Sequence, residues 1–300
     1  MITEQLSPSE WAHRQAAHEA RLGPVVKAHL ARRKAGRKHP VVDFLFEYYG
    51  FRPSRLMKWT PGVGVLLKDG AEHFSDRRHF RAIGSDALVE PGGLRPDRQA
   101  ATRWILRLLE QTRDRPPMLG CHGLHEWAMV YRDGEVRHER TPLRVTRERI
   151  REVVDAGPLV CTHYDAFRFF APSARPLNHR LLEAGSQHAS EQPGCLHANM
   201  DLYRWAMKRW PFIPSSLVAE AFLLALEIRE VDMRASPYDL SGLGFTPIAI
   251  ETAEGRDEYR CHQQRFYERA RPLRERLIGA YRRLLTAMPS GEETGTTVCL

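Results

Sequence analysis

Three short segments of the chain each combine histidine with carboxylates, and each contains a cysteine. They read Gly-Cys-His-Gly-Leu-His-Glu-Trp at 120–127, Cys-Thr-His-Tyr-Asp at 161–165 and Gly-Cys-Leu-His-Ala-Asn-Met-Asp at 194–201, while a fourth, His-Pro-Val-Val-Asp at 39–43, lacks only the cysteine. Imidazole beside carboxylate supplies metal ligands and general acid–base catalysts. Such groups are uncommon in protein cores, because every buried polar group needs a hydrogen-bond or ionic partner. The pattern predicts an enzyme whose site is assembled from distant segments.

Two of the segments have spacings that would bring both polar groups to one side. His163 and Asp165 alternate in a predicted extended stretch. His197 and Asp201 are four residues apart at a predicted helix start and would share a helix face. The pattern His-Glu-x-x-His is absent, which excludes a zincin. The candidate metal ligands are His125, Glu126, His163, Asp165, His197 and Asp201.

A structural role is open for each of these segments. Asp165 could pair with Arg168 three residues later, and the Asp201 carboxylate could interact favourably with the dipole of its own helix. The cysteines at 121, 161 and 195 could be zinc or iron ligands, but buried core positions suit them better. Arg234 could clamp a carboxylate or phosphate, or pair with an internal aspartate.

Composition indicates a globular protein, with 42% hydrophobic and 27% charged residues among 300. No apolar run is long enough for a membrane helix, and no secretory signal is recognised, so no membrane partner is predicted. Five scattered cysteines without a Cys-x-x-Cys pair predict a reducing cytoplasm. The net charge of +8 and the basic stretch 27–38 leave DNA open as a partner. Glycine-rich phosphate loops and the Gly-x-Ser-x-Gly elbow are absent, which excludes those cofactor and hydrolase classes.

Apolar periodicity and capping residues predict a mainly α fold with a few short strands, in a single compact helical domain. Helices are expected at 8–35, 39–49, 97–113, 146–156, 199–209, 214–232 and 254–286. Short strands are expected at 63–68, 128–132, 159–162 and 246–252, with 60–98 otherwise an irregular connection. The predicted organisation is a basic N-terminal helical segment 1–38, a single catalytic domain 39–288 and a loose C-terminal tail 289–300.

As a set, the stretches 39–49, 123–131, 161–170, 191–203 and 232–239 resemble a bacterial family labelled 3-methyladenine DNA glycosylase. The resemblance covers about residues 39 to 285. It implies hydrolysis of the N-glycosidic bond of alkylated bases in DNA, a step in DNA repair that needs no cofactor.

Such a reaction needs a carboxylate and an aromatic pocket for the flipped base. Glu126 or Asp165 would be the acid, with His125 beside it. The predicted substrate-binding residues are Trp127, Tyr131, Tyr164, Arg168 and Arg234. The residues themselves also support an alternative, in which the His/carboxylate segments bind iron or zinc for hydrolysis or oxidation of a small molecule. A nucleic-acid-binding helical module ranks last, because it leaves the histidines unexplained.

Overall fold

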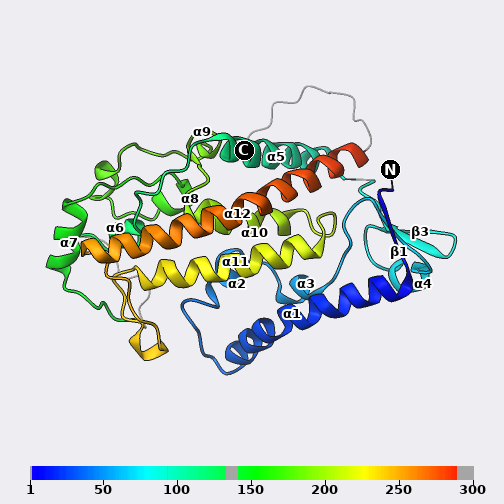
Figure 1. The fold of residues 1–300 in the computed structure, drawn as a ribbon, viewed down its shortest axis with the longest axis horizontal. Helices are drawn as coiled ribbons and strands as arrows, with labels where there is room; N and C mark the ends of the chain where they lie inside the picture. The colour runs from blue at the N-terminus through cyan, green and yellow to red at the C-terminus, as the bar shows by residue number, and fades with distance from the viewer. Residues whose placement is uncertain (1, 93, 133–140, 289–300) are drawn as a thin grey trace.

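The computed structural model describes residues 2–92, 94–132 and 141–288, and over these residues the chain is mainly α with one small sheet (Figure 1). The predicted fold class is therefore confirmed. The helices are α1 (Pro8–Lys34), α2 (Phe44–Tyr48), α3 (Pro53–Met57), α4 (Ala71–Phe74), α5 (Pro96–Asp114), α6 (Leu124–Met129), α7 (Arg147–Asp155), α8 (Tyr164–Phe167), α9 (Gln187–Ser190), α10 (Leu196–Lys208), α11 (Ser215–Arg234) and α12 (Ala253–Ala287), with 3₁₀ turns η1 (Arg175–Leu177) and η2 (Ser241–Leu243).

The sheet contains β1 (Glu4–Leu6), β2 (Val65–Leu67), β3 (Phe80–Ile83) and β4 (Asp86–Val89) in the order β1-β2-β4-β3. Strand β1 pairs parallel to β2, and the other two pairings are antiparallel. The sheet lies at one end of the molecule, whereas α6, α7 and α8 lie at the other (Figure 1).

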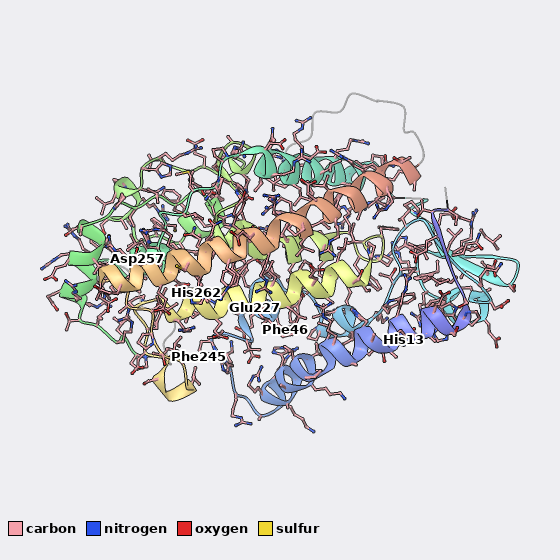
Figure 2. All side chains as sticks on the ribbon, viewed as in Figure 1. His13, Phe46, Glu227, Phe245, Asp257 and His262 are labelled. Atoms are coloured by element: carbon pink, nitrogen blue, oxygen red, sulfur yellow. The ribbon has the colours of Figure 1, made fainter. Side chains whose placement is uncertain are left out.

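Four long helices, α5, α10, α11 and α12, form the central layer, with α12 packed against the other three. Helix α1 packs against α3 and α11. Phe46, labelled in Figure 2, reaches from α2 to Phe222 of α11, with ring centroids 5.4 Å apart. The inner faces of these helices share one apolar core. This core holds in place the helix ends that contain the His/carboxylate segments.

The long helices begin where the sequence supplies capping groups. Ser7 and Glu10 form a capping box at the start of α1. The side chains of Thr146 and Thr252 each accept a backbone N–H at the starts of α7 and α12. These starts confirm the predicted helices 8–35, 146–156 and 254–286.

Several predicted strands do not form. Residues 124–129 are the helix α6, since a run that is buried on all sides shows no period that separates helix from strand. The predicted strand 159–162 makes only one bridge, from Leu159 to Asn178, and 246–252 is not a strand. Conversely, the connection 60–98 contains three of the four strands.

The N-terminal segment 1–38 is built into the rest of the fold. Strand β1 belongs to the sheet, and Leu22 and Val26 of α1 lie in the same core as α10, α11 and α12. The predicted tail 289–300 lies outside the described residues. Among the described helices, none has the length and apolar character that crossing a membrane requires.

Candidate metal centre

The three segments that contain cysteine converge at the end of the molecule opposite the sheet (Figure 1). His125 lies on α6, His163 precedes the first residue of α8, and His197 lies in the first turn of α10. The ring of His197 is 4.5 Å from that of His125 and 5.4 Å from that of His163, measured between centroids. The predicted convergence of these three histidines is therefore confirmed.

The fourth segment, 39–43, does not join them. Asp43 is buried against α1, where its carboxylate accepts from His29 Nδ1 at 2.8 Å and from the Arg32 guanidinium. The Asp43 carboxylate also accepts the backbone N–H of His39 at 2.9 Å. This network ties α1 to the start of α2 and is structural.

Two groups of side chains in the described part of the chain have the geometry to hold a metal ion. The first is His125, His197 and Asp232, whose donor atoms lie within 4.8 Å of one another. Asp232 comes from the last turn of α11. Two imidazoles and one carboxylate form the ligand set of non-haem iron sites and of several catalytic zinc sites.

A buried, poorly aligned ion pair marks this first group. His125 Nε2 and Asp232 Oδ1 are 2.9 Å apart, both are buried, and neither makes a hydrogen bond of acceptable geometry. The other atoms of the pair are held: His125 Nδ1 lies 3.8 Å from Cys121 Sγ, and Asp232 Oδ2 accepts from Arg229 Nη1 at 3.0 Å. These contacts fix the orientation of both candidate ligands.

The electrostatics of the group follow from burial and proximity. Burial lowers the pKa of His125, but the Asp232 charge outweighs it and raises that pKa well above its usual value. Burial raises the pKa of Asp232, yet the His125 charge holds it well below its usual range. Burial and the charge on His125 lower the pKa of His197 to about 3. His197 is therefore a neutral imidazole at pH 7, the form that binds metals.

The second group is His163, Asp165 and Asp201. His163 Nε2 lies 3.8 Å from Asp201 Oδ2, and His163 Nδ1 lies 3.3 Å from Glu191 Oε1. Burial lowers the pKa of His163 to about 4, and burial together with the Asp201 charge raises the pKa of Glu191 well above its usual range. Arg204 contacts both aspartates of this group.

Glu126, predicted as a ligand or as the catalytic acid, belongs to neither group. Its Oε1 accepts from Arg229 Nη1 at 2.8 Å, so the guanidinium holds it. The predicted extended geometry of 161–165 is also wrong beyond His163, because Asp165 lies in the first turn of α8. The helical turn nonetheless brings Asp165 and His163 into one group.

The predicted stacking residues are largely in the core. Trp127 is fully buried and donates Nε1–H to the Ala235 carbonyl at 2.8 Å, and Tyr131 is buried and donates to Asp155. Neither ring is placed to stack on a flipped base, because packed side chains cover both. Tyr164 is half-buried beside the second group.

The two predicted arginines have different surroundings. Arg168 is partly exposed at the edge of the second group, with Nε 3.1 Å from Asp165 Oδ1. Arg234 donates Nε–H to the Thr246 carbonyl at 2.8 Å and pairs with Glu258, so it belongs to the packing of α11 against α12. Arg234 also lines a cavity of about 270 Å³ with Arg144 and Asp239, and its role as a substrate contact stays a prediction.

Sequence reasoning missed five residues of the cluster: Tyr49, Glu191, Arg204, Arg229 and Asp232. A usable signal existed for two of them. Arg229 and Asp232 are three residues apart in α11, a helix whose other inward positions are mostly apolar, and both are fully buried. A buried charge in an apolar helix calls for a partner, and here the partners are the candidate ligands.

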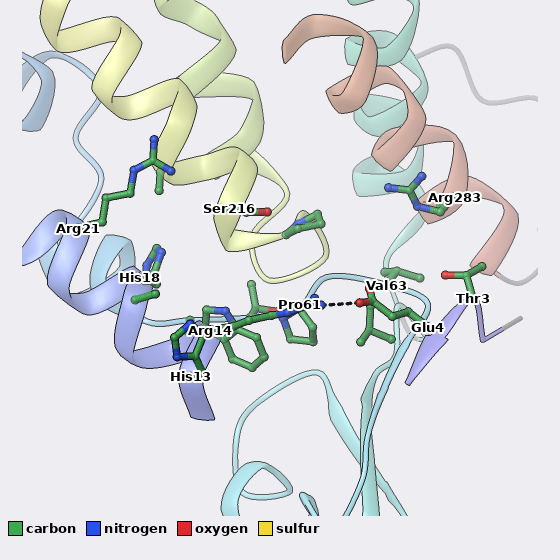
Figure 3. Close-up of a pocket in the computed structure, with 16 residues that line it drawn as sticks. Thr3, Glu4, His13, Arg14, His18, Arg21, Pro61, Val63, Ser216 and Arg283 are labelled. Carbon is green, nitrogen blue, oxygen red and sulfur yellow. Dashed lines mark hydrogen bonds and ion pairs between the residues drawn. The ribbon is translucent and has the colours of Figure 1, made fainter. Parts of the chain in front are cut away.

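A cavity of about 690 Å³ lies near the sheet, between α1, the start of α11 and the end of α12 (Figure 3). Arg14 and Glu4 form an ion pair at 2.7 Å in its wall, and Arg21 and Arg283 also line it (Figure 3). The cluster histidines are not part of its lining. This cavity therefore lies apart from the candidate metal centre.

Comparison of the chain with models of known protein families, with curated proteins and with solved structures finds no match.

Proposed function

We propose that the chain is a metal-dependent enzyme whose centre is His125, His197 and Asp232, with iron or zinc as the metal. The observation that carries the proposal is the buried ion pair of His125 Nε2 and Asp232 Oδ1, which lie 2.9 Å apart with an alignment too poor for a hydrogen bond. An imidazole nitrogen and a carboxylate oxygen that face each other in this way are both metal ligands. A cation bound to both atoms would replace the poorly aligned contact between them.

Metal binding at the centre would exchange a proton for a cation. Asp232 and Glu126 are buried, and both carboxylates pair with Arg229 Nη1. Since the histidines bind a metal in their neutral form, a divalent ion would take the place of the proton that the His125–Asp232 pair otherwise holds.

The reaction class that suits this centre is hydrolysis or oxidation of a small molecule. When bound, the metal would polarise a substrate oxygen or lower the pKa of a water molecule. His197 and Asp165 are half-buried, whereas the other residues of the two groups are buried. Neutral His163 stacks beside His197 and would accept a proton from a substrate or a water molecule bound at the centre.

The test is the metal content of protein purified without chelator, measured by inductively coupled plasma mass spectrometry. We expect one iron or zinc per chain, and its loss in His197→Ala and in the isosteric Asp232→Asn. His18→Ala is the matched control, because His18 is also buried but bonds the Leu56 carbonyl far from the cluster. Folded wild-type protein that binds neither metal, even after dialysis against each, would refute the proposal.

A second candidate is the DNA N-glycosylase activity implied by the sequence resemblance, and one observation favours it. A cavity of about 610 Å³ is lined by Arg33, Arg37, Lys38 and Arg52 from the basic N-terminal segment and the start of α3. Three of these cations have no carboxylate partner within the described residues, a pattern that suits phosphates. Release of 3-methyladenine from alkylated DNA by chelator-treated protein would support this candidate over the metal enzyme.

A further inference from the structure

The second group, His163, Asp165 and Asp201, lies directly beside the proposed metal centre. The rings of His163 and His197 are stacked with centroids 5.4 Å apart, so the two groups of candidate ligands adjoin. Two-metal enzymes place their ions about 3.5–4 Å apart, with ligand sets that adjoin in this manner. The contacts of each group therefore indicate whether the cluster binds one ion or two.

In the second group, every carboxylate oxygen lies in a hydrogen bond or an ion pair with a donor of the chain. Asp201 Oδ1 accepts from the Tyr49 hydroxyl at 2.7 Å, and Asp201 Oδ2 accepts from Arg204 Nη1 at 3.1 Å. Asp165 Oδ2 accepts from the same Nη1 at 2.6 Å, and Asp165 Oδ1 lies 3.1 Å from Arg168 Nε. One nitrogen of Arg204 thus lies between the two aspartates, where a bridging cation would lie.

The first group differs in this respect. Arg229 Nη1 contacts Oδ2 of Asp232 and Oε1 of Glu126, while Oδ1 of Asp232 faces His125 Nε2 at 2.9 Å. In the first group, the proton between Oδ1 and the imidazole can be exchanged for a metal ion, whereas in the second group a guanidinium lies between the carboxylates. A guanidinium remains charged at any physiological pH, so it is a permanent counter-ion for the two aspartates.

We infer that the Arg204 guanidinium occupies the position of a second metal ion, so that the cluster takes up one ion per chain instead of two. The inference rests on the proposed function, because it concerns the same cluster. Arg204 thereby acts as a positioning residue, which holds Asp165 and Asp201 in place next to the centre without coordinating the metal.

The experiment is the stoichiometry of Zn²⁺ binding to the full chain by equilibrium dialysis. We expect one ion for the wild type and two for Arg204→Met, which keeps the aliphatic stem but removes the charge. Arg168→Met is the matched control and stays at one ion, because Arg168 contacts one aspartate only. The double variant Arg204→Met/His163→Ala returns to one ion, which assigns the added ion to the second group.

The outcomes separate this inference from the proposed function. One ion in both the wild type and folded Arg204→Met overturns the inference and leaves the proposed centre intact, and two ions in the wild type do the same. No ion in the wild type but one in Arg204→Met overturns the proposed function and supports the inference, whereas no ion in either overturns both. If Arg204→Met does not fold, the conservative Arg204→Lys keeps a cation there and must stay at one ion, and two ions in it would count against the inference.

Discussion

Asp43→Asn tests whether the fourth His/carboxylate segment is structural, as its position away from the cluster indicates. Burial raises the pKa of Asp43, but hydrogen bonds from Arg32, His29 and the His39 backbone outweigh it and lower the pKa from 3.8 to about 2. The side chain is buried, so little discount for solvent screening applies. A shift of about 2 units corresponds to about 2.5 kcal/mol of stability at pH 7.

The sign of the pH dependence follows from the direction of the shift. A carboxylate whose pKa is lower in the folded state contributes its stability above the unfolded value, and loses it as the pH falls through the folded value. The difference in free energy of unfolding between the wild type and Asp43→Asn is therefore expected to keep its full value of about 2.5 kcal/mol from pH 7 down to pH 5. It should fall to about half by pH 3 as Asp43 takes up its proton.

The assay is urea denaturation of both proteins at pH 7, 5, 4 and 3, with metal content measured in parallel. Asp232→Asn is the contrasting variant, since it should lose the metal, whereas Asp43→Asn should keep it. A stability difference that stays constant from pH 7 to pH 3 would mean that packing, and not the charge network, accounts for the loss. Metal loss in Asp43→Asn would contradict the assignment of this segment to the scaffold.

Three further predictions concern the cluster and the helices that position it. Arg229→Met removes the cation between two buried carboxylates and should lower the free energy of unfolding by about 3–5 kcal/mol in urea denaturation. Gly255→Ala should lower the melting temperature, because its Cβ would lie 2.0 Å from the Ala249 carbonyl oxygen; the control Gly279→Ala, whose nearest neighbour is 3.6 Å away, should be neutral or stabilising. Removal of metal by a chelator should lower the melting temperature of the wild type by about 5–10 °C if the free metal had been near 100 times its Kd, and should leave that of Asp232→Asn unchanged.

The sequence was informative about the long helices, because caps and apolar periods are local. The capping box at Ser7 and Glu10 and the threonines before α7 and α12 are visible within four residues of each start. Short buried segments gave no such signal. The run 128–131 is buried on every side, so alternation could not show that residues 124–129 are helical.

The candidate site was predicted in part, for a similar physical reason. His125, His163 and His197 lie close to carboxylates in the sequence, and that local pattern predicted that the three histidines converge. The partner that completes the first group, Asp232, is more than thirty residues from His197 along the chain, and only the packing of α11 against α10 brings them together. Which carboxylate faces which histidine is decided by helix packing and is not written in any one segment.

The chain contains an internal comparison that bears on the proposed centre. In the His29–Asp43 pair, both carboxylate oxygens accept from donors of the chain, so the pair is complete without a ligand. In the His125–Asp232 pair, the carboxylate oxygen and the imidazole nitrogen face each other at 2.9 Å, but their alignment is too poor for a hydrogen bond, although both are buried. The same fold thus gives one buried pair well-aligned donors and leaves the other with a poorly aligned contact. A metal ion bound between His125 and Asp232, as proposed, would supply both atoms with a well-aligned partner.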